Sequence, residues 1–446
     1  MMKISKYSFF FDVDNAEFYI YNTLSNALIE IDEELYSSLL NYKNNNLNIV
    51  LDEIDKESRE ILISKKVFTK NYLDDFLYYK SILNTQRGAT SFMHLTVAPT
   101  MDCCFSCHYC FEKYKTSNYM SEDVMDGIIN YLNSLNSKPE LKLTWFGGEP
   151  LMALSQMERF YEKLVTKYKE PLNSNLITTG FHLNENAIDV IKRLGIQQVQ
   201  ITLDGLKETH NAIKNLSECT DVFNKVLDNV ALLLSLSDVH VVFRVNLTKK
   251  NKHEYVRLYQ YLQKRFQDFE HKGISPAFVM DRGCHQENVV DDFFTSKEIA
   301  PFVLDLYNNY QVHSPFLRYP SRFFNECAIR NKMSMSFDPE GYAYKCWEVI
   351  GNKEYAIGRI NVDGKLGNIN EVVLNRHLYG ADPIEDPTCS ECRYLPICNG
   401  GCPIQRIENL FEGGKNYCCT FWKGNLEKLL KVHLQLRKNG FRNSPD

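Results

Sequence analysis

An alternation of short apolar runs and amphipathic helices between residues 92 and 283 constrains the fold most. Strands that are each followed by one helix form right-handed crossovers and therefore a parallel sheet. The strand candidates are 92–100, 140–148, 174–180, 197–205, 239–248 and 274–283, and the helix candidates are 121–135, 154–168, 185–195, 221–234 and 253–266. The sequence thus predicts an α/β protein with a partial (β/α)6 barrel of the TIM type, whose ligands bind at the carboxyl ends of the strands.

Two further regions flank this barrel, which we expect to span residues 90–300. Residues 1–85 open with aromatic runs that predict a β-hairpin around Asp14 and Asn15. Helical patterns follow at 32–42, 51–65 and 71–83, so this region is expected to be a small winged-helix-like domain. Residues 301–446 are rich in loops and form the third predicted domain.

The composition narrows the class of protein. The chain has 446 residues, of which 44% are hydrophobic and 24% charged, and its formal net charge is −5. A chain without a basic excess is not expected to bind nucleic acid. The first twenty residues lack the pattern of a signal peptide, and no run of eighteen apolar residues occurs. We therefore expect a cytoplasmic protein with no membrane partner.

Fourteen cysteines are unusual in a cytoplasmic chain, where clustered thiols indicate metal or redox chemistry. Four occur in the segment MDCCFSCHYC, directly after the first barrel strand. Cys103, Cys107 and Cys110 have the spacing CxxxCxxC. Three thiolates are one fewer than a tetrahedral zinc or a fully ligated cubane cluster needs, so an open metal position is implied. The alternative is a zinc loop with a distant fourth ligand.

This loop resembles the signature of radical S-adenosylmethionine (SAM) enzymes. The resemblance implies that Cys103, Cys107 and Cys110 hold a [4Fe-4S] cluster whose free iron binds SAM, and that the enzyme forms a 5′-deoxyadenosyl radical. The segment WFGGEP at the end of the second strand resembles the GGEP motif of the family. By that resemblance Gly147, Gly148 and Glu149 contact the amino group of SAM.

Looser matches extend the expected SAM site. ITTG, ITLDG and FRVNLT resemble further strand-end motifs of the family. The additional SAM contacts implied are Tyr109, Thr179, Thr202, Asp204 and Arg244. Strand-end packing or turn chemistry is the alternative for Thr202 and Asp204, and a salt bridge within the barrel is the alternative for Arg244. Of the other cysteines, Cys104 is expected to be a spectator, and Cys219 and Cys284 to be packed as small hydrophobic residues.

The cysteines after residue 300 resemble the SPASM extension of radical SAM enzymes, CX9-15GX4C followed by CX2CX5CX3C and a last cysteine. The resemblance implies two auxiliary [4Fe-4S] clusters, three clusters in all. One is expected on Cys389, Cys392, Cys398 and Cys418, and the other on Cys327, Cys346 and Cys402. Cys418 is preferred to Cys419 because YC is the commoner ending. The second set leaves an iron open for Glu326 or a substrate thiolate, and one or two zinc sites are the alternative for the whole array.

A winged-helix-like domain before such a core resembles the recognition element of enzymes that modify ribosomally made precursor peptides. We therefore expect residues 1–85 to bind a leader peptide as an added strand, and a flavodoxin or ferredoxin to supply electrons. Thioether formation is the preferred reaction, with carbon–carbon or carbon–oxygen crosslinking and epimerisation as alternatives. Anaerobic sulfatase maturation ranks lower, because Trp347 follows Cys346 where those enzymes have an Asp base. A zinc-stabilised binding scaffold is the non-enzymatic alternative.

Overall fold

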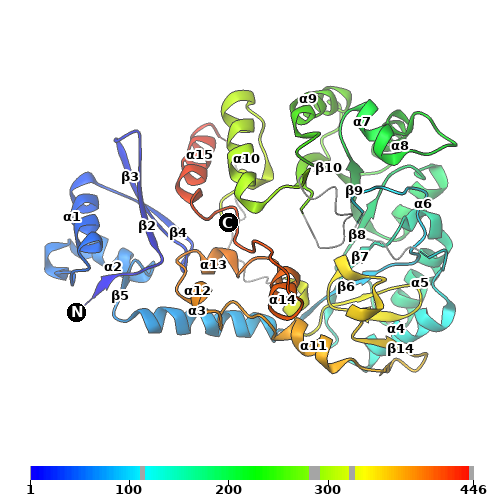
Figure 1. Cartoon of the computed structure of the whole chain (residues 1–446), viewed down its shortest axis with the longest axis horizontal. Helices are drawn as coiled ribbons and strands as arrows, with labels where there is room; N and C mark the ends of the chain where they lie inside the picture. Colours follow the sequence, from blue (N-terminus) through cyan, green and yellow to red (C-terminus); the bar gives the residue numbers. More distant parts are fainter. Residues whose placement is uncertain (1, 111–115, 281–291, 321–326, 441–446) are drawn as a thin grey trace.

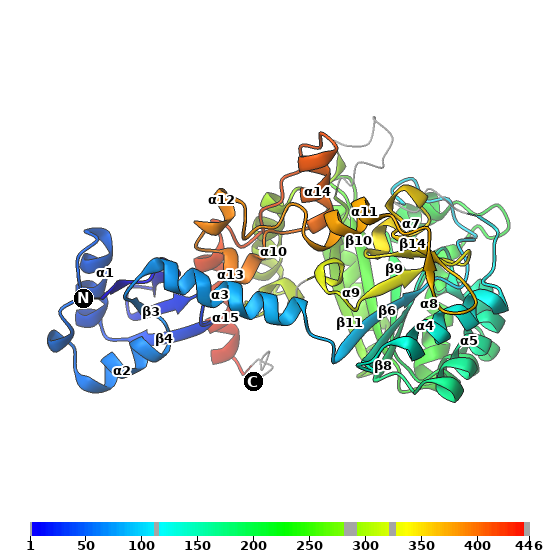
Figure 2. The same cartoon turned by 90° about the horizontal axis from the view of Figure 1, so that it is seen from below.

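The structure is a computed structural model that describes residues 2–110, 116–280, 292–320 and 327–440. The molecule is elongated, with the N-terminal domain at one end and the barrel at the other (Figure 1). Helices α10 and α15 and the short helices α12 and α13 lie between them. The long helix α3 runs from the N-terminal domain towards the barrel, as Figure 2 also shows.

The N-terminal domain consists of a three-stranded antiparallel sheet and three helices, with a small two-stranded sheet beside them. The predicted hairpin forms at Asp14 and Asn15, whose φ angles of 53° and 54° are those of the two central residues of a tight turn, closed by a backbone bond from Ala16 to Val13 (3.0 Å). The third strand, β4, was not predicted. The elements are β1 (Lys3–Ile4), β2 (Ser8–Val13), β3 (Glu17–Asn22), β4 (Ala27–Ile31), α1 (Glu33–Asn44), α2 (Lys56–Ser64), β5 (Phe68–Thr69) and α3 (Tyr72–Arg87).

The barrel prediction is confirmed. All six predicted strands form and lie side by side in chain order, and every adjacent pair is parallel. The five predicted helices are present, and α7 is an addition that the sequence analysis missed. The elements are β6 (Phe92–Val97), α4 (Glu122–Ser134), β7 (Glu140–Trp145), α5 (Leu154–Lys167), β8 (Asn173–Thr178), α6 (Glu185–Arg193), β9 (Ile196–Leu203), α7 (Lys207–Lys214), α8 (Val222–Leu236), β10 (His240–Leu247), α9 (Tyr255–Arg265) and β11 (Lys272–Phe278).

The C-terminal region extends this sheet instead of standing apart from it. Strand β12 (Met335–Phe337) pairs in parallel with β6, and β13 (Tyr342–Tyr344), β14 (Gly358–Ile360) and β15 (Leu366–Gly367) follow antiparallel, which gives ten strands. The sheet stays open and does not close into a barrel. The segment around Cys346 is thereby attached to the edge of the sheet beside the first barrel strand.

The remaining helices join the two ends of the molecule. One face of the N-terminal sheet, including Phe9 and Tyr21, packs in one core with α10 and α15. Helix α10 contains the predicted boundary at residue 300. The helices are α10 (Ser296–Tyr310), α11 (Glu371–Leu378), α12 (Pro387–Ser390), α13 (Leu395–Cys398), α14 (Pro403–Phe411) and α15 (Leu426–Lys438). Within the described ranges, no helix has the length and apolar character needed to cross a bilayer.

Candidate active site

A cavity of about 230 Å³ opens at the carboxyl ends of the barrel strands. Residues from the cysteine loop, from the ends of the five strands β7 to β11 and from the C-terminal region line it together. Most of the residues expected to hold the cluster or SAM are in this lining: Cys103, Cys107, Tyr109, Cys110, Gly147, Gly148, Thr179, Thr202 and Arg244. Cys103 and Glu348, which are 245 residues apart in the sequence, therefore meet at one site, and this site is where the barrel fold predicts it.

The cysteine loop is held by hydrogen bonds at its base. Thr100 donates its hydroxyl to the backbone carbonyl of Asn118 (2.8 Å) and accepts from the backbone N–H of Asp102 (3.0 Å). A backbone bond from Cys110 to Cys107 (3.1 Å) closes a turn between the last two cysteines. Three thiols that line one cavity fit a [4Fe-4S] cluster, in which each thiolate binds a different iron and one iron stays open to a ligand.

Gly147 and Gly148 bring the second strand end against this loop. The φ of Gly147 is 113°, and a side chain on Gly148 would lie 2.1 Å from the carbonyl oxygen of Asp102. Backbone bonds join Gly148 to Thr100 (3.2 Å) and Glu149 to Asp102 (2.7 Å). Only glycine permits so close an approach, so this motif and the cysteine loop form one rigid unit.

Glu149 is fully buried and lies behind the cavity lining. Its carboxylate accepts hydrogen bonds from the hydroxyl of Thr178 (2.6 Å) and from both the hydroxyl (2.5 Å) and the backbone N–H (2.9 Å) of Thr179. Both threonines line the cavity. In this structure Glu149 therefore acts by positioning the third strand end.

Asp204 also lies behind the lining, in a buried polar network that reaches the cysteine loop. It is fully buried and accepts hydrogen bonds from the hydroxyl of Tyr109 and the amide of Asn246. Burial alone would raise the pKa of Asp204, but the nearby ammonium of Lys214 outweighs it, and the pKa falls below its usual range. The sequence analysis missed Lys214 and Asn246, both of which line the cavity.

The mouth of the cavity is formed partly by the C-terminal region. Trp347 and Glu348, directly after Cys346, belong to the lining, and the indole of Trp347 stacks on Phe146 at 5.5 Å between ring centroids. Arg244 lines the mouth and donates to the side chain of Asn246 (3.4 Å). Glu348 is the carboxylate among the described lining residues, a role that no sequence motif indicated.

The expected auxiliary set of Cys327, Cys346 and Cys402 lies together. Burial raises the pKa of the Cys346 thiol, and the charge of Glu348 adds to the rise. Cys327 and Cys402 lie near enough to raise it further. Cys346 and Cys402 pack against the same small apolar cluster. Glu326, the suggested extra ligand, lies outside the described residues.

The cysteines of the other expected set, Cys389, Cys392, Cys398 and Cys418, also interact with one another. Both candidates for the last ligand, Cys418 and Cys419, are close to this set. Burial raises the pKa of Cys418 to about 11, and Cys402, Cys419 and Cys389 contribute. Cys419 also lies near enough to Cys398 to raise the pKa of that thiol. Gly401 makes this proximity possible, because a side chain there would lie 1.8 Å from the carbonyl oxygen of Cys418.

The arrangement of these thiols bears on the zinc alternative. Within the described residues, no group of three or more His, Cys, Asp or Glu side chains has the geometry to hold a single metal ion. Thiolates of a cubane bind different irons and stand further apart than those around one zinc. Cys219 packs against the main core as expected, and Cys284 lies outside the described residues.

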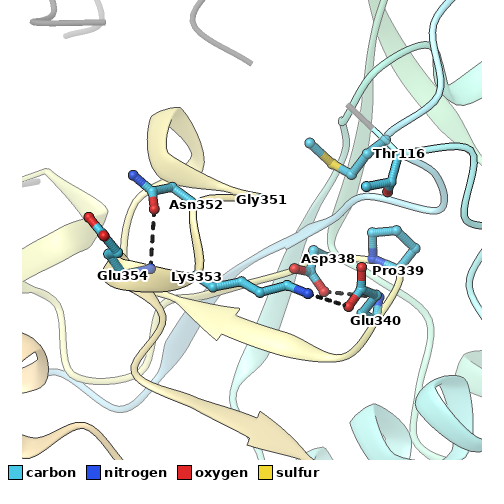
Figure 3. A pocket seen from close by; sticks show the side chains of 9 residues that line it. Thr116, Asp338, Pro339, Glu340, Gly351, Asn352, Lys353 and Glu354 are labelled. Atoms are coloured by element: carbon cyan, nitrogen blue, oxygen red, sulfur yellow. Dashed lines mark hydrogen bonds and ion pairs between the residues drawn. The ribbon is translucent and has the colours of Figure 1, made fainter. Parts of the chain in front are cut away.

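A second cavity of about 460 Å³ lies beyond the cysteine loop, bounded by the turn between β12 and β13 and by residues 351–354 (Figure 3). Lys353 pairs there with Glu340 at 2.7 Å. Asp338 lies beside them, with its carboxylate buried. None of the predicted cluster or SAM residues lines this cavity, so the chemistry belongs to the first one.

The cysteine loop, the glycine motif and the strand ends form a site for a cluster and SAM at the carboxyl ends of the parallel strands. Comparison with known families agrees: the family model described as "Radical SAM superfamily" matches residues 97–262. Residues 97–262 therefore form a radical SAM domain. One [4Fe-4S] cluster and SAM are thus its cofactors, and they supply the radical that begins the reaction.

Two relatives show how far the likeness extends. The cysteine-type anaerobic sulfatase-maturating enzyme of Clostridium novyi is 23% identical over 369 residues, which cover 74% of this chain and 94% of that protein. The radical SAM cyclopropyl synthase TigE of Paramaledivibacter caminithermalis is 22% identical and covers 98% of this chain and 97% of its own.

Two solved structures likewise cover about three quarters and nearly all of this chain. The sulfatase-maturating enzyme anSMEcpe, with bound AdoMet and Cp18Cys peptide, has a TM-score of 0.57 at 18% identity and covers 77% of this chain and 99% of its own. Streptococcus suis SuiB has a TM-score of 0.52 at 14% identity and covers 94% of this chain and 100% of its own. These values establish a common fold.

Proposed function

We propose that this enzyme modifies a ribosomally made precursor peptide, captures the leader of that peptide with residues 1–85, and forms a thioether crosslink. The carrying observation is that a domain with an open sheet edge is built into the same chain as the SAM cavity. Strand β4 pairs with β3 on one side. On its other side, no backbone group of the described residues hydrogen-bonds to residues 28–31. An open edge of this kind accepts an extended peptide as a further strand.

The other edge of that sheet is contacted at its first residue. The side chains of Lys43 (2.8 Å) and Arg393 (3.0 Å) both donate to the backbone carbonyl of Ser8 in β2. The domain is therefore fixed to the C-terminal region through β2 and keeps β4 available.

The likeness to SuiB favours this reading over sulfatase maturation. The 6% of the chain outside that likeness is about 27 residues, so most of residues 1–85 have a counterpart in SuiB. SuiB has been solved with its precursor peptide SuiA. The anSMEcpe likeness leaves 23% of this chain unmatched, an extent similar to that of the whole N-terminal domain.

The thioether assignment requires a proton acceptor and an electron acceptor. Joining a Cys sulfur to a carbon removes one hydrogen atom from the carbon, which the 5′-deoxyadenosyl radical takes, and one proton from the thiol. We assign the proton to the Glu348 carboxylate at the cavity mouth. One electron remains. Cys327, Cys346 and Cys402 would hold an auxiliary [4Fe-4S] cluster that would supply an electron acceptor beside the cavity, because Cys346 directly precedes the lining residues Trp347 and Glu348.

The auxiliary clusters and external partners belong to the same proposal. We place two auxiliary clusters on the C-terminal cysteines. Reductive cleavage of SAM at the cluster on Cys103, Cys107 and Cys110 requires low-potential electrons, for which a flavodoxin or ferredoxin is the donor class. Free thiols and reduced clusters persist in a reducing compartment, and we therefore place the enzyme in the cytoplasm.

Sulfatase maturation is the second candidate, favoured by the 23% identity with the Clostridium novyi enzyme. The test is anaerobic incubation of the reconstituted enzyme with SAM, a reductant and the small peptide encoded beside its gene, followed by mass spectrometry. A loss of two hydrogens with loss of one free thiol supports thioether formation. An unchanged mass with an inverted residue means epimerisation, and formylglycine on a sulfatase peptide replaces the proposal. A Cys103→Ala variant is the control for radical dependence.

A further inference from the structure

Lys214 is a buried lysine that lies directly behind the radical-generating cysteine loop. It is the last residue of α7, and its side chain is only 3% exposed. Its ammonium nitrogen donates a hydrogen bond to Sγ of Cys107 (3.4 Å) and lies 3.2 Å from Oδ2 of Asp204. The same ammonium lies 5.4 Å from the centre of the Phe105 ring. A lysine is rarely buried without compensation, so this placement requires an explanation.

The surrounding groups leave the positive charge on Lys214. The Asp204 carboxylate, 3.2 Å away, pairs with this ammonium and balances its charge inside the protein. The neighbouring imidazole of His210 accepts a bond from the backbone N–H of Asp204 at Nδ1 (3.3 Å). Burial lowers the pKa of His210 to about 4, so the imidazole is neutral.

The fold holds α7 so that this lysine points inward. Glu254 accepts bonds from the backbone N–H of Leu206 (2.7 Å) and the hydroxyl of Thr209 (2.5 Å) at the start of the helix. Gly205 permits this contact, because a side chain there would lie 2.6 Å from the Glu254 carboxylate. Asp204 is held in turn by Tyr109 and Asn246. The protein therefore holds in place both the helix that carries Lys214 and the Asp204 carboxylate that its ammonium contacts.

We propose that Lys214 is a positioning residue for the cluster on Cys103, Cys107 and Cys110, and that its charge raises the reduction potential of that cluster. An N–H bond to a ligating sulfur and a nearby positive charge both stabilise the reduced, more negative state. The inference rests on the placement of the cluster on these three cysteines. It adds that Asp204, which a family motif would assign to SAM, acts on the cluster through Lys214.

The test compares three substitutions of Lys214 with one matched control. Lys214→Arg keeps the charge, Lys214→Gln keeps an N–H donor without charge, and Lys214→Met keeps only the apolar stem. Lys207→Gln is the control, because Lys207 lies on the same helix but pairs with Asp221 at the surface. Each reconstituted full chain is assayed for iron, and its SAM-responsive electron paramagnetic resonance signal is titrated against potential.

In Lys214→Gln and Lys214→Met we expect a lower midpoint potential and at least a tenfold lower fraction of reduced cluster at fixed potential. A tenfold change corresponds to 59 mV for a one-electron couple. Deoxyadenosine formation should recover when a stronger reductant is supplied, which a purely structural defect would not allow. Lys214→Arg should stay near the parent protein.

Two results would overturn the inference. One is an unchanged midpoint in Lys214→Gln and Lys214→Met at full iron content. The other is loss of the cluster from Lys214→Arg as well, because that variant keeps the charge. A SAM-responsive signal that survives in Cys107→Ala would instead refute the placement of the cluster itself.

Discussion

Arg87 at the end of α3 and Asp382 in the C-terminal region form a buried bidentate ion pair, with N–O distances of 2.5 and 3.0 Å. Their side chains are 10% and 6% exposed. The pair joins the helix that leaves the N-terminal domain to the region that carries the auxiliary cysteines. Asp382 also accepts from the backbone N–H of Ile384 (3.1 Å), so its carboxylate orders the loop before α12.

Arg87→Ala should destabilise the protein by about 3–5 kcal/mol, because it leaves a carboxylate buried without its partner. Anaerobic urea denaturation of both proteins measures the difference. The double variant Arg87→Met with Asp382→Leu should lose less, since it buries no unpaired charge. Lys192→Ala is the control, because its pair with Asp189 is exposed and 4.0 Å long. An equal loss in the single and double variants would contradict the interpretation.

The sequence predicted the elements that a long periodic pattern specifies. All six barrel strands and five of its helices were found because apolar spacing marks them over many residues. Strands β12 to β15 have only two or three residues each, which is too short for a periodic signal. Strand β12 forms because β6 offers it an edge to pair with, and β13, β14 and β15 each pair with the strand before them.

The candidate site was predictable where motifs name the residues, and only there. Cys103, Cys107 and Cys110 were found from their spacing, and the cavity brings them together. Lys214 was missed because a lysine at the end of an amphipathic helix is usually a solvated C-terminal charge. Glu348 belongs to no motif. Only the pairing of β12 with β6 brings its segment to the barrel.

Glu149→Gln should weaken SAM binding without changing any residue of the cavity lining. The carboxylate accepts two bonds from Thr179 and one from Thr178. An amide replaces one acceptor by a donor, so at least one of these bonds is lost and a buried donor is left unpaired, at a cost of about 1–3 kcal/mol. Isothermal titration of SAM into the reconstituted protein measures the affinity. An unchanged affinity would show that the two threonines do not depend on Glu149.

Glu348→Gln should lower the yield of crosslinked peptide per deoxyadenosine formed. Loss of a positioned general base typically slows a reaction by about 10²–10⁴-fold. Liquid chromatography with mass spectrometry measures both products in one sample. Glu354→Gln is a matched control, because Glu354 lies on the same C-terminal segment but lines the second cavity. An equal yield in the two variants would remove Glu348 from the proposed mechanism.

Asp338 should make the folded protein less stable as the pH rises. Burial raises its pKa from 3.8 to about 6, so the folded state binds this proton more tightly than the unfolded chain does. The stabilisation is complete below the unfolded pKa and is lost as the pH rises through about 6. Asp338→Asn should therefore flatten the pH dependence of unfolding between pH 5 and pH 7, measured anaerobically by urea denaturation. An identical slope in both proteins would contradict the raised pKa.

The outer edge of β4 allows a test of peptide capture that keeps folding and binding apart. Successive N–H groups of a strand point to opposite edges. Of the two variants Ile29→Pro and Glu30→Pro, one therefore removes a hydrogen bond to β3, and the other removes a donor on the open edge.

The variant that loses the hydrogen bond to β3 should unfold at a lower temperature. The variant that loses the donor on the open edge should keep its unfolding temperature near that of the parent. It should bind a fluorescently labelled leader peptide at least tenfold more weakly, as measured by anisotropy. A strand added to β4 requires that donor, whereas a leader held only by side-chain contacts does not. If both variants bind the peptide as tightly as the parent, the leader does not add to β4.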